Sequence, residues 1–271
     1  MTTGALIFAY NNDKTDYVKM AAWTACNIKR HLNIPVALVT DSIDAASKYN
    51  FDNFDKIIKS ESDGSNSRHF SDYNSNVVWH NTTRTDAYSV TPWDQTLVLD
   101  ADYVVANNSL KAILHSQEQF LAHNRAYDIT GLNDFSGLNY FGNYHMPMWW
   151  ATVMMFRKGK QAELIFDAMK MVRDNWNHYR RIYHNNQPTY RNDHALTISL
   201  GIVNGHYTNY SNIPWPLASL TTEHKLTQID IDRYRVDFIT PDRKLRWINI
   251  DNQDFHAMGK QQLGGIIDSQ I

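Results

Sequence analysis

The chain has few of the features that mark secreted, disulfide-stabilised or membrane-spanning proteins. It contains a single cysteine, Cys26, in 271 residues, which excludes an internal disulfide and a cysteine-rich zinc site. No apolar run approaches the roughly 20 residues that a bilayer-spanning helix needs. The N-terminal segment lacks a charged region, and its apolar run is too short for a signal peptide. We therefore expect a cytoplasmic protein without a transmembrane segment.

The composition is also without a strong charge of either sign. The formal net charge is -2, with 43% hydrophobic and 20% charged residues. These values are ordinary for a folded chain and argue against disorder. They give no overall attraction to nucleic acid or to an anionic membrane, although a local basic face stays possible. Because no stretch has the composition of a linker, we expect one domain over residues 1–271, with halves at 1–105 and 106–271.

The first 40 residues show the alternation of a βαβ unit. An apolar run, Ala5–Ala9, predicts a strand, and a helix with apolar residues at helical spacing follows from a cap at Thr15 or Asp16. Pro35–Thr40 predicts the next strand, which makes a parallel sheet the expected core. Ligands of such sheets bind beyond the carboxyl ends of the strands. Residues at those ends are therefore candidates for a nucleotide site: Ala9, Tyr10, Asn11 and Asp41.

Further elements follow from composition and periodicity. Residues 60–76, rich in Ser, Asp, Asn and Gly, predict a loop. Asn108 and Ser109 are expected to cap a helix that continues to Leu121. The apolar run 148–156 predicts a strand, and because successive strand side chains face opposite ways, one of Trp149 and Trp150 is expected in the core while the other is available to stack on a sugar.

Two carboxylates stand where a buried strand ends. Thr96–Leu99 is apolar and β-prone, and Asp100 and Asp102 follow it directly. Positions two apart point the same way on an extended chain, so the two anions repel unless a cation lies between them. A hard divalent ion that takes phosphate oxygens as its remaining ligands would relieve that repulsion. The alternative is a pair of solvated loop acids.

The run LVLDADYVV resembles the D-x-D segment of nucleotide-sugar glycosyltransferases of the GT-A fold, in particular the family of glycogenin and the bacterial lipopolysaccharide galactosyltransferases. The segment Asp254–Lys260, DFHAMGK, is similar to that family's C-terminal H-x-x-G motif. The resemblance implies an α/β fold: a single GT-A (Rossmann-like) domain with a central mixed, mostly parallel sheet flanked by helices. It also implies that Asp100, Asp102 and His256 hold Mn²⁺ (or Mg²⁺) against the donor diphosphate.

The same resemblance assigns further roles. It places the nucleoside of a nucleoside-diphosphate sugar, with UDP expected, near residues 9–11, a donor-facing cation at Arg84, and an acidic catalytic residue at Asp193, with retention of configuration. The family carries a lysine three residues after the motif glycine, whereas here Lys260 follows Gly259 directly and Gln262 takes the usual lysine position. Which cation meets the diphosphate is left open by the sequence. For Asp193 a simple helix cap is the alternative.

The acceptor is open as well, because residues 173–191 alternate arginines with aromatic residues. Arginine for phosphate and aromatic rings for stacking is a composition found in nucleic-acid-binding proteins. Besides a glycan, the acceptor considered is therefore a hydroxymethylated base in DNA, as some bacteriophage glycosyltransferases modify. A solvated helix end is the structural alternative for this segment.

Two other functions compete with glycosyl transfer. A nucleotidyltransferase would also use D-x-D to hold Mg²⁺, but it would carry a glycine-rich phosphate loop after its first strand, and YNNDKTD has no glycine. A catalytically silent sugar- or nucleotide-binding module would keep the acids for structure alone.

Overall fold

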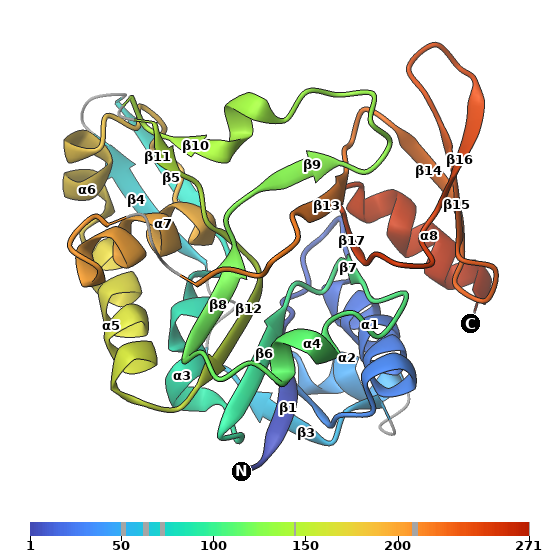
Figure 1. Cartoon of the computed structure of the whole chain (residues 1–271), viewed down its shortest axis with the longest axis horizontal. Helices are drawn as coiled ribbons and strands as arrows, with labels where there is room; N and C mark the ends of the chain where they lie inside the picture. Colours follow the sequence, from blue (N-terminus) through green and yellow to red (C-terminus); the bar gives the residue numbers. More distant parts are fainter. Residues whose placement is uncertain (50–52, 62–64, 71–73, 144, 208–210, 271) are drawn as a thin grey trace.

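The structure is a computed structural model that describes residues 1–49, 53–61, 65–70, 74–143, 145–207 and 211–270. At its centre lies a six-stranded sheet in the order β3-β2-β1-β6-β12-β8 (Figure 1). Four neighbours run parallel, namely β3 (Lys56–Lys59), β2 (Val36–Thr40), β1 (Thr3–Phe8) and β6 (Gln95–Leu99). β12 (Trp150–Arg157) is antiparallel to β6 and to β8 (Phe120–His123). The sheet thus confirms the predicted α/β class with a mixed, mostly parallel core.

The central strands are buried on both faces, which explains their continuous apolar runs. In β1, Ala5 and Ile7 face the layer that contains α1 (Tyr17–Leu32) and α8 (Lys260–Gln270). Leu6 and Phe8 face the opposite layer with α5 (Lys160–Asp174) and α7 (Asn192–Val203). Figure 1 shows these two helical layers on either side of the sheet.

The predicted first βαβ unit is confirmed, including its helix start. Asp16 is the N-cap of α1, and its side chain accepts a hydrogen bond from the backbone amide of Lys19 at 2.9 Å. The helix ends at Asn33, which adopts the left-handed conformation with φ 56°. An N-cap side chain such as that of Asp16 contributes about 1 kcal/mol to helix stability. The carboxyl ends of β1, β2 and β6 consequently lie along one edge of the sheet.

A second, four-stranded sheet lies in the order β7-β17-β13-β9 and brings the C-terminal motif next to the segment that follows the D-x-D residues. Its strands are β7 (Tyr103–Val104), β17 (Phe255–Ala257), β13 (Leu217–Leu220) and β9 (Ala126–Asp128). β17 is antiparallel to β7, with His256 opposite Tyr103. Next to this pair, Oδ1 of the buried Asp254 accepts hydrogen bonds from the amides of Ala106 and Asn107 at 2.7 and 3.1 Å. These contacts fix the C-terminal motif against the D-x-D segment.

The remaining elements surround these two sheets. A hairpin pairs β4 (Asn66–Phe70) with β5 (Ser75–Trp79), and a three-stranded sheet contains β14 (Lys225–Asp230), β15 (Arg235–Ile239) and β16 (Leu245–Asn249). The short elements are α2 (Ile43–Lys48), η3 (Thr82–Asp86), α3 (Ala87–Val90), α4 (Lys111–Leu114), η4 (Ser136–Asn139), β10 (Tyr140–Phe141), β11 (Met146–Pro147) and α6 (Trp176–Ile182).

Two local predictions are wrong. The loop expected over residues 60–76 contains β4 and the start of β5, while its residues 62–64 and 71–73 lie outside the described part of the chain. The helix expected from 110 to 121 is reduced to α4, because Phe120 pairs with Phe156 as part of β8, the strand at the edge of the main sheet. Pairing with a buried neighbouring strand outweighs the helical spacing of the apolar residues in this segment.

Trp149 and Trp150 are both buried, with 7% and 8% of their surface exposed. They belong to different core layers, as the alternation of side chains along a strand predicts. Neither is therefore an open platform for a sugar. Among the described residues, no helix is long and apolar enough to cross a bilayer.

Candidate active site

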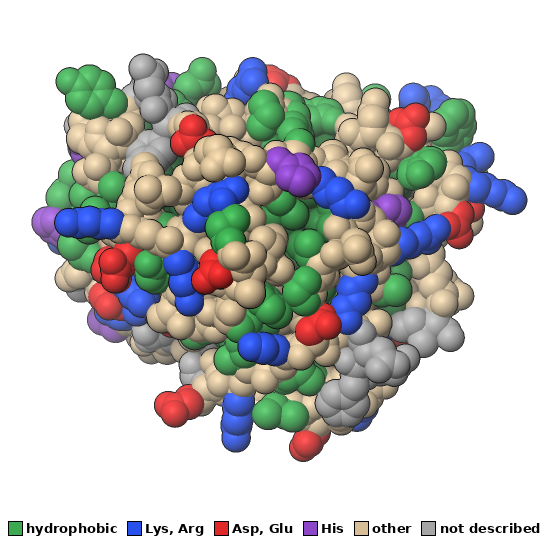
Figure 2. All heavy atoms as spheres, turned by 60° about the horizontal axis from the view of Figure 1, so that its bottom comes forward, with side chains coloured by type: hydrophobic (Ala, Val, Ile, Leu, Met, Phe, Trp, Pro, Cys, Tyr) green, Lys and Arg blue, Asp and Glu red, His purple; other side chains and the backbone are tan. Residues whose placement is uncertain are grey.

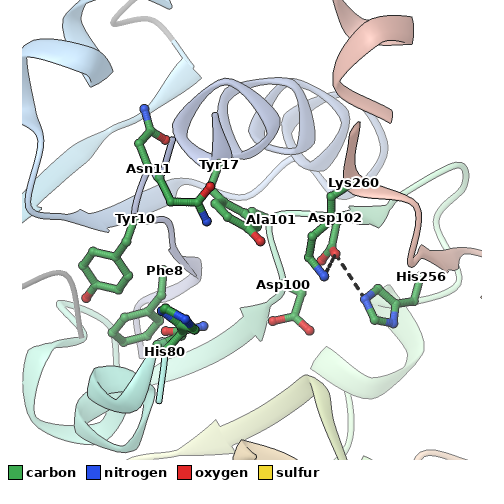
Figure 3. Close-up of a pocket in the computed structure, with 12 residues that line it drawn as sticks. Phe8, Tyr10, Asn11, Tyr17, His80, Asp100, Ala101, Asp102, His256 and Lys260 are labelled. Carbon is green, nitrogen blue, oxygen red and sulfur yellow. Dashed lines mark ion pairs between the residues drawn. The ribbon is translucent and has the colours of Figure 1, made fainter. Parts of the chain in front are cut away.

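Three predicted metal ligands come together at the carboxyl end of β6. One ligand atom each from Asp100, Asp102 and His256 lies within 4.8 Å of the others. The sharp turn after β6 is held by the amide of Tyr103, which donates to the carbonyl of Asp100 at 3.1 Å. Pairing of β7 with β17 then brings His256 to the carboxylates from 154 residues further along the chain than Asp102. Figure 3 shows the three side chains pointing toward one another.

A lysine enters the same site from the start of α8. Nζ of Lys260 lies 3.2 Å from Oδ2 of Asp102, and Nε2 of His256 lies 3.3 Å from that same oxygen. Burial raises the pKa of Asp102, but His256 and Lys260 outweigh it and hold the pKa below its ordinary value. The Asp102 carboxylate raises the pKa of Lys260, and it raises the pKa of His256 against the effect of burial. The site is thus a buried cluster of opposite charges.

Arg84 lies beneath Asp100 rather than in open solvent. It is 1% exposed, its guanidinium donates to Oδ1 of Asp100, and it also donates to the carbonyl of Thr152 at 3.3 Å. Burial raises the pKa of Asp100, with Arg84 opposing it and the Asp102 carboxylate adding to it. The guanidinium of Arg84 therefore orients the Asp100 carboxylate and partly neutralises its charge.

Asp193 lines a second cavity that adjoins Asp100. This cavity of about 200 Å³ also includes His80, Arg84 and Arg191. Asp193 is not the cap of α7, because Arg191 holds that position, so the helix-cap expectation is wrong. Its side chain instead accepts from the amide of Ala151 and from the guanidinium of Arg191, both at 2.8 Å. Burial raises the pKa of Asp193, but Arg191 and the Ala151 amide outweigh it, so the pKa is lowered.

The larger of the two cavities at this site, called the main cavity from here on, has a volume of about 340 Å³ and connects the carboxyl end of β1 with the metal-ligand cluster. Predicted donor residues in its wall are Tyr10, Asn11 and Lys260. The hydroxyl of Tyr10 lies 2.6 Å from that of Thr83, and Oδ1 of Asn11 accepts from the amide of Val18 at 2.9 Å. Of the other predicted donor residues, Arg84 lines the smaller cavity instead, and Ala9, Asp41 and Gly259 lie outside this wall.

Ala9 is 1% exposed, and its amide donates to the carbonyl of Val39 at 3.0 Å. The carbonyl of Gly259 accepts from Leu263 at the start of α8. Asp41 is exposed, and its charge is among the causes that raise the pKa of Tyr10, after burial. All three therefore flank residues of the wall.

Several residues of the wall were not anticipated from the sequence. Tyr17 projects from the first turn of α1, and His80 follows β5 and borders both cavities (Figure 3). Asn12 also lines the cavity, and its side chain accepts from the amides of Lys14 and Thr15. No sequence signal pointed to His80, because β5 before it was not predicted and its first two residues were assigned to the loop 60–76. Tyr17 stood in a helix whose other residues at the same spacing are buried.

The donor set fits a hard divalent cation. Oδ2 of Asp102 is fully buried and accepts no hydrogen bond of normal geometry, and its neighbours are the cationic group of Lys260 and the imidazole of His256 at ion-pair distance. Two carboxylates and one imidazole match the preferences of Mn²⁺, and carboxylates with water or phosphate match Mg²⁺. Asp100, Asp102 and His256 would hold such an ion, and the ion would offset the charge of a phosphate leaving group.

The arginine-aromatic segment 173–191 divides its arginines between the surface and the interior: Arg181 and Arg191 are exposed, whereas Arg173 and Arg180 make internal contacts. Arg180 is 3% exposed and stacks on the ring of Phe70. Arg173 donates to the hydroxyl of Thr85 at 2.6 Å. The aromatic residues of the segment also pack inward: Trp176, Tyr183 and Tyr190 are buried. Arg173, Arg180 and these rings therefore serve the packing between α6, the β4-β5 hairpin and η3.

The face of the molecule in Figure 2 shows no basic patch that would indicate a nucleic-acid site. Basic and acidic side chains of its described residues are interspersed there and do not gather into a patch of one sign. This distribution agrees with the net charge of -2.

Comparisons with solved structures return the enzyme class that the motifs resemble. The chain is similar to the galactosyltransferase LgtC in complex with donor and acceptor sugar analogues (13% identity, TM-score 0.45, 72% of this chain and 70% of that one). It is also similar to mouse xyloside xylosyltransferase 1 (10% identity, TM-score 0.47, 82% and 89%). A third similar structure is the glycosyltransferase GlyE of Streptococcus pneumoniae TIGR4 (14% identity, TM-score 0.44, 79% and 46%).

The chain spans about half the length of the GlyE structure. No protein-family model matches the chain, and the search of curated proteins gives no match. At these identities and TM-scores the similarities decide nothing about activity, so the proposal below stands on the geometry of the site.

Proposed function

We propose that this chain is a metal-dependent glycosyltransferase that moves a sugar from a nucleoside-diphosphate donor, expected to be UDP-linked, to an acceptor hydroxyl with retention of configuration. The observation that carries the proposal is the convergence of Asp100, Asp102 and His256 in one cavity with Lys260. A cluster of two acids, an imidazole and a lysine beside a pocket is suited to a diphosphate with its cation.

The two adjoining cavities support a division of labour. We assign the main cavity, with Tyr10, Asn11 and Tyr17 in its wall, to the nucleotide and diphosphate. The smaller cavity beyond Asp100, which contains Asp193, would receive the sugar. A carboxylate kept ionised by Arg191 and a backbone amide can hydrogen-bond sugar hydroxyls and stabilise positive charge that develops at the anomeric carbon. Asp193 is thus our catalytic candidate.

The chemistry would rest on stabilising the leaving group rather than on proton transfer. Breaking the sugar-phosphate bond leaves negative charge on the diphosphate, which Lys260 is positioned to meet as a point charge. The bound cation would supply electrophilic assistance to the same oxygens. Burial strengthens these interactions, because the low dielectric around Asp102 weakens screening by water.

For the acceptor we propose a carbohydrate hydroxyl. Its support is the internal role of Arg173 and Arg180, which takes two of the four arginines of segment 173–191 away from any DNA-binding surface. A hydroxymethylcytosine duplex should consequently show no specific binding even at low salt. Tight binding that weakens steeply with salt would restore the DNA acceptor.

The direct test is to incubate the protein and Mn²⁺ with a panel of nucleotide sugars and glycan acceptors, and to identify products by mass spectrometry. A glycosyltransferase releases nucleoside diphosphate and adds one sugar mass to the acceptor. In a parallel incubation with nucleoside triphosphates and sugar 1-phosphates, formation of a nucleotide sugar with release of pyrophosphate would indicate the nucleotidyltransferase alternative. Binding of a nucleotide sugar without any turnover across the panel would favour the silent binding module.

A further inference from the structure

The ammonium group of Lys260 lies against a carboxylate oxygen of Asp102 that a metal ion would use as a ligand. Its Nζ lies 3.2 Å from Oδ2 of Asp102, and Asp102 is one of the three residues of the metal-ligand cluster. Oδ2 is buried, so water screens this contact weakly. In Figure 3 the ammonium group and the imidazole of His256 approach Asp102 from neighbouring directions. A lysine that only contacted the diphosphate of a bound donor would not need to lie against a metal ligand.

The lysine reaches this position because of where it stands in the chain. Lys260 is the first residue of α8 and follows Gly259 directly. Gln262, at the position where the resembling family carries its lysine, is engaged elsewhere: its Oε1 accepts from the amide of Leu226 at 3.0 Å. The replacement therefore moves the charge two residues earlier in the chain and onto a metal ligand.

The ammonium and a divalent cation do not share that oxygen at low cost. Two positive charges a few ångströms apart in a buried site repel each other strongly. Lys260 can leave, because its side chain is 39% exposed and carries four rotatable methylenes. Its natural destination is the diphosphate of a bound nucleotide, whose oxygens offer more negative charge than one half of a carboxylate.

We propose that Lys260 is an internal competitor for the metal, which holds Asp102 in the empty enzyme and is drawn off by the nucleotide diphosphate. The inference rests on the proposed function and adds a regulatory property to it. Metal affinity is low until the nucleotide binds, and nucleotide affinity rises equally when the metal is present, because coupling between two ligands is reciprocal. The enzyme is thereby protected from loading a metal ion without its donor.

The test measures Mn²⁺ binding by electron paramagnetic resonance, which needs no turnover, with and without UDP. Without UDP, Lys260→Met should bind Mn²⁺ about tenfold more tightly than the wild type, which corresponds to about 1.4 kcal/mol. Lys260→Arg keeps the charge and should stay weak. Lys14→Met, which removes an exposed charge two residues after Asn12 of the cavity wall, is the matched control and should match the wild type.

The outcomes separate this inference from the proposed function. Equal or weaker Mn²⁺ binding by Lys260→Met without UDP overturns the competition. An equal gain in Lys14→Met overturns it as well, because the effect would then be general electrostatics. A gain confined to Lys260→Met, together with a rise in the Mn²⁺ affinity of the wild type when UDP is added, supports the proposal. An unchanged wild-type affinity with UDP overturns the release of Lys260 by the diphosphate, whereas the proposed function fails separately if no nucleotide sugar is turned over in the donor screen. No Mn²⁺ binding by any variant, with UDP present, overturns both.

Discussion

The buried pair of Arg84 and Asp100 gives a quantitative test of how the site is supported. The side chains are 2% and 26% exposed, and Arg84 also donates to the carbonyl of Thr152. Removing one partner of a buried ion pair leaves an uncompensated charge and costs about 3 to 5 kcal/mol. We expect Arg84→Met to lie near the lower end of this range, because the partly exposed Asp100 can gain some hydration.

The pair should also be strongly coupled. Asp100→Asn alone leaves the buried guanidinium without its carboxylate, whereas the double variant Arg84→Met/Asp100→Asn removes both charges. Its loss of unfolding free energy should therefore be smaller than the sum of the single losses by about 2 kcal/mol or more. Urea unfolding followed by circular dichroism gives the four free energies without any activity assay.

A matched control is the exposed pair Arg30 and Asp232, whose side chains are 52% and 74% exposed. Its double-mutant cycle should give a coupling of about 1 kcal/mol or less, since water and ions screen the contact. Additive losses at Arg84 and Asp100, within about 0.5 kcal/mol, would refute the view that Arg84 supports the carboxylate from below.

The remaining predictions concern stability, pH and ligand contact. Asp254→Ala should cost about 2 to 4 kcal/mol in urea unfolding because two buried amides lose their acceptor, whereas Asp254→Asn keeps an acceptor and should cost less; equal losses would count against this clamp. The buried His123 has its pKa lowered to about 4 by burial, below the 6.5 of the unfolded chain. Its contribution to stability is therefore full above pH 6.5 and falls as the pH drops toward 4, by up to roughly 3 kcal/mol; His123→Asn should flatten this slope, and an unchanged slope would exclude His123 as its source. Amide hydrogen exchange should slow at both residues 9–11 and residues 256–260 when UDP and Mn²⁺ are added. Protection of only one segment would mean that the two segments do not share a nucleotide pocket.

Sequence reasoning was strongest where a local pattern determines local structure. The cap at Asp16 and the apolar run before Asp100 are decided by neighbouring residues, and the structure confirms both. His256 was placed with the D-x-D segment by a resemblance of motifs. The physical link between them, the antiparallel pairing of β17 with β7, joins residues that no short-range pattern connects.

The failures occurred where tertiary contacts override composition. Phe120 lies at helical spacing with its apolar neighbours, yet it is part of the edge strand β8, because the backbone of β12 needs a hydrogen-bonding partner on that side. Arg180 has the composition of a nucleic-acid contact, but its guanidinium lies over the ring of Phe70, which comes from a hairpin that was expected to be a loop. The position of Lys260 on Asp102 follows from the geometry of α8 and was likewise beyond sequence reasoning.

The most direct test of the central claim is the rate of nucleoside-diphosphate release from the nucleotide sugar that the screen identifies, followed across a Mn²⁺ titration in the wild type and in Asp102→Asn. We predict saturable activation of the wild type, loss of activity on chelation, and a rate at least about a hundredfold lower in a stably folded Asp102→Asn, since one substitution removes a metal ligand that acts on the leaving group. Turnover that persists after exhaustive chelation, or that is undiminished in Asp102→Asn, would contradict the account.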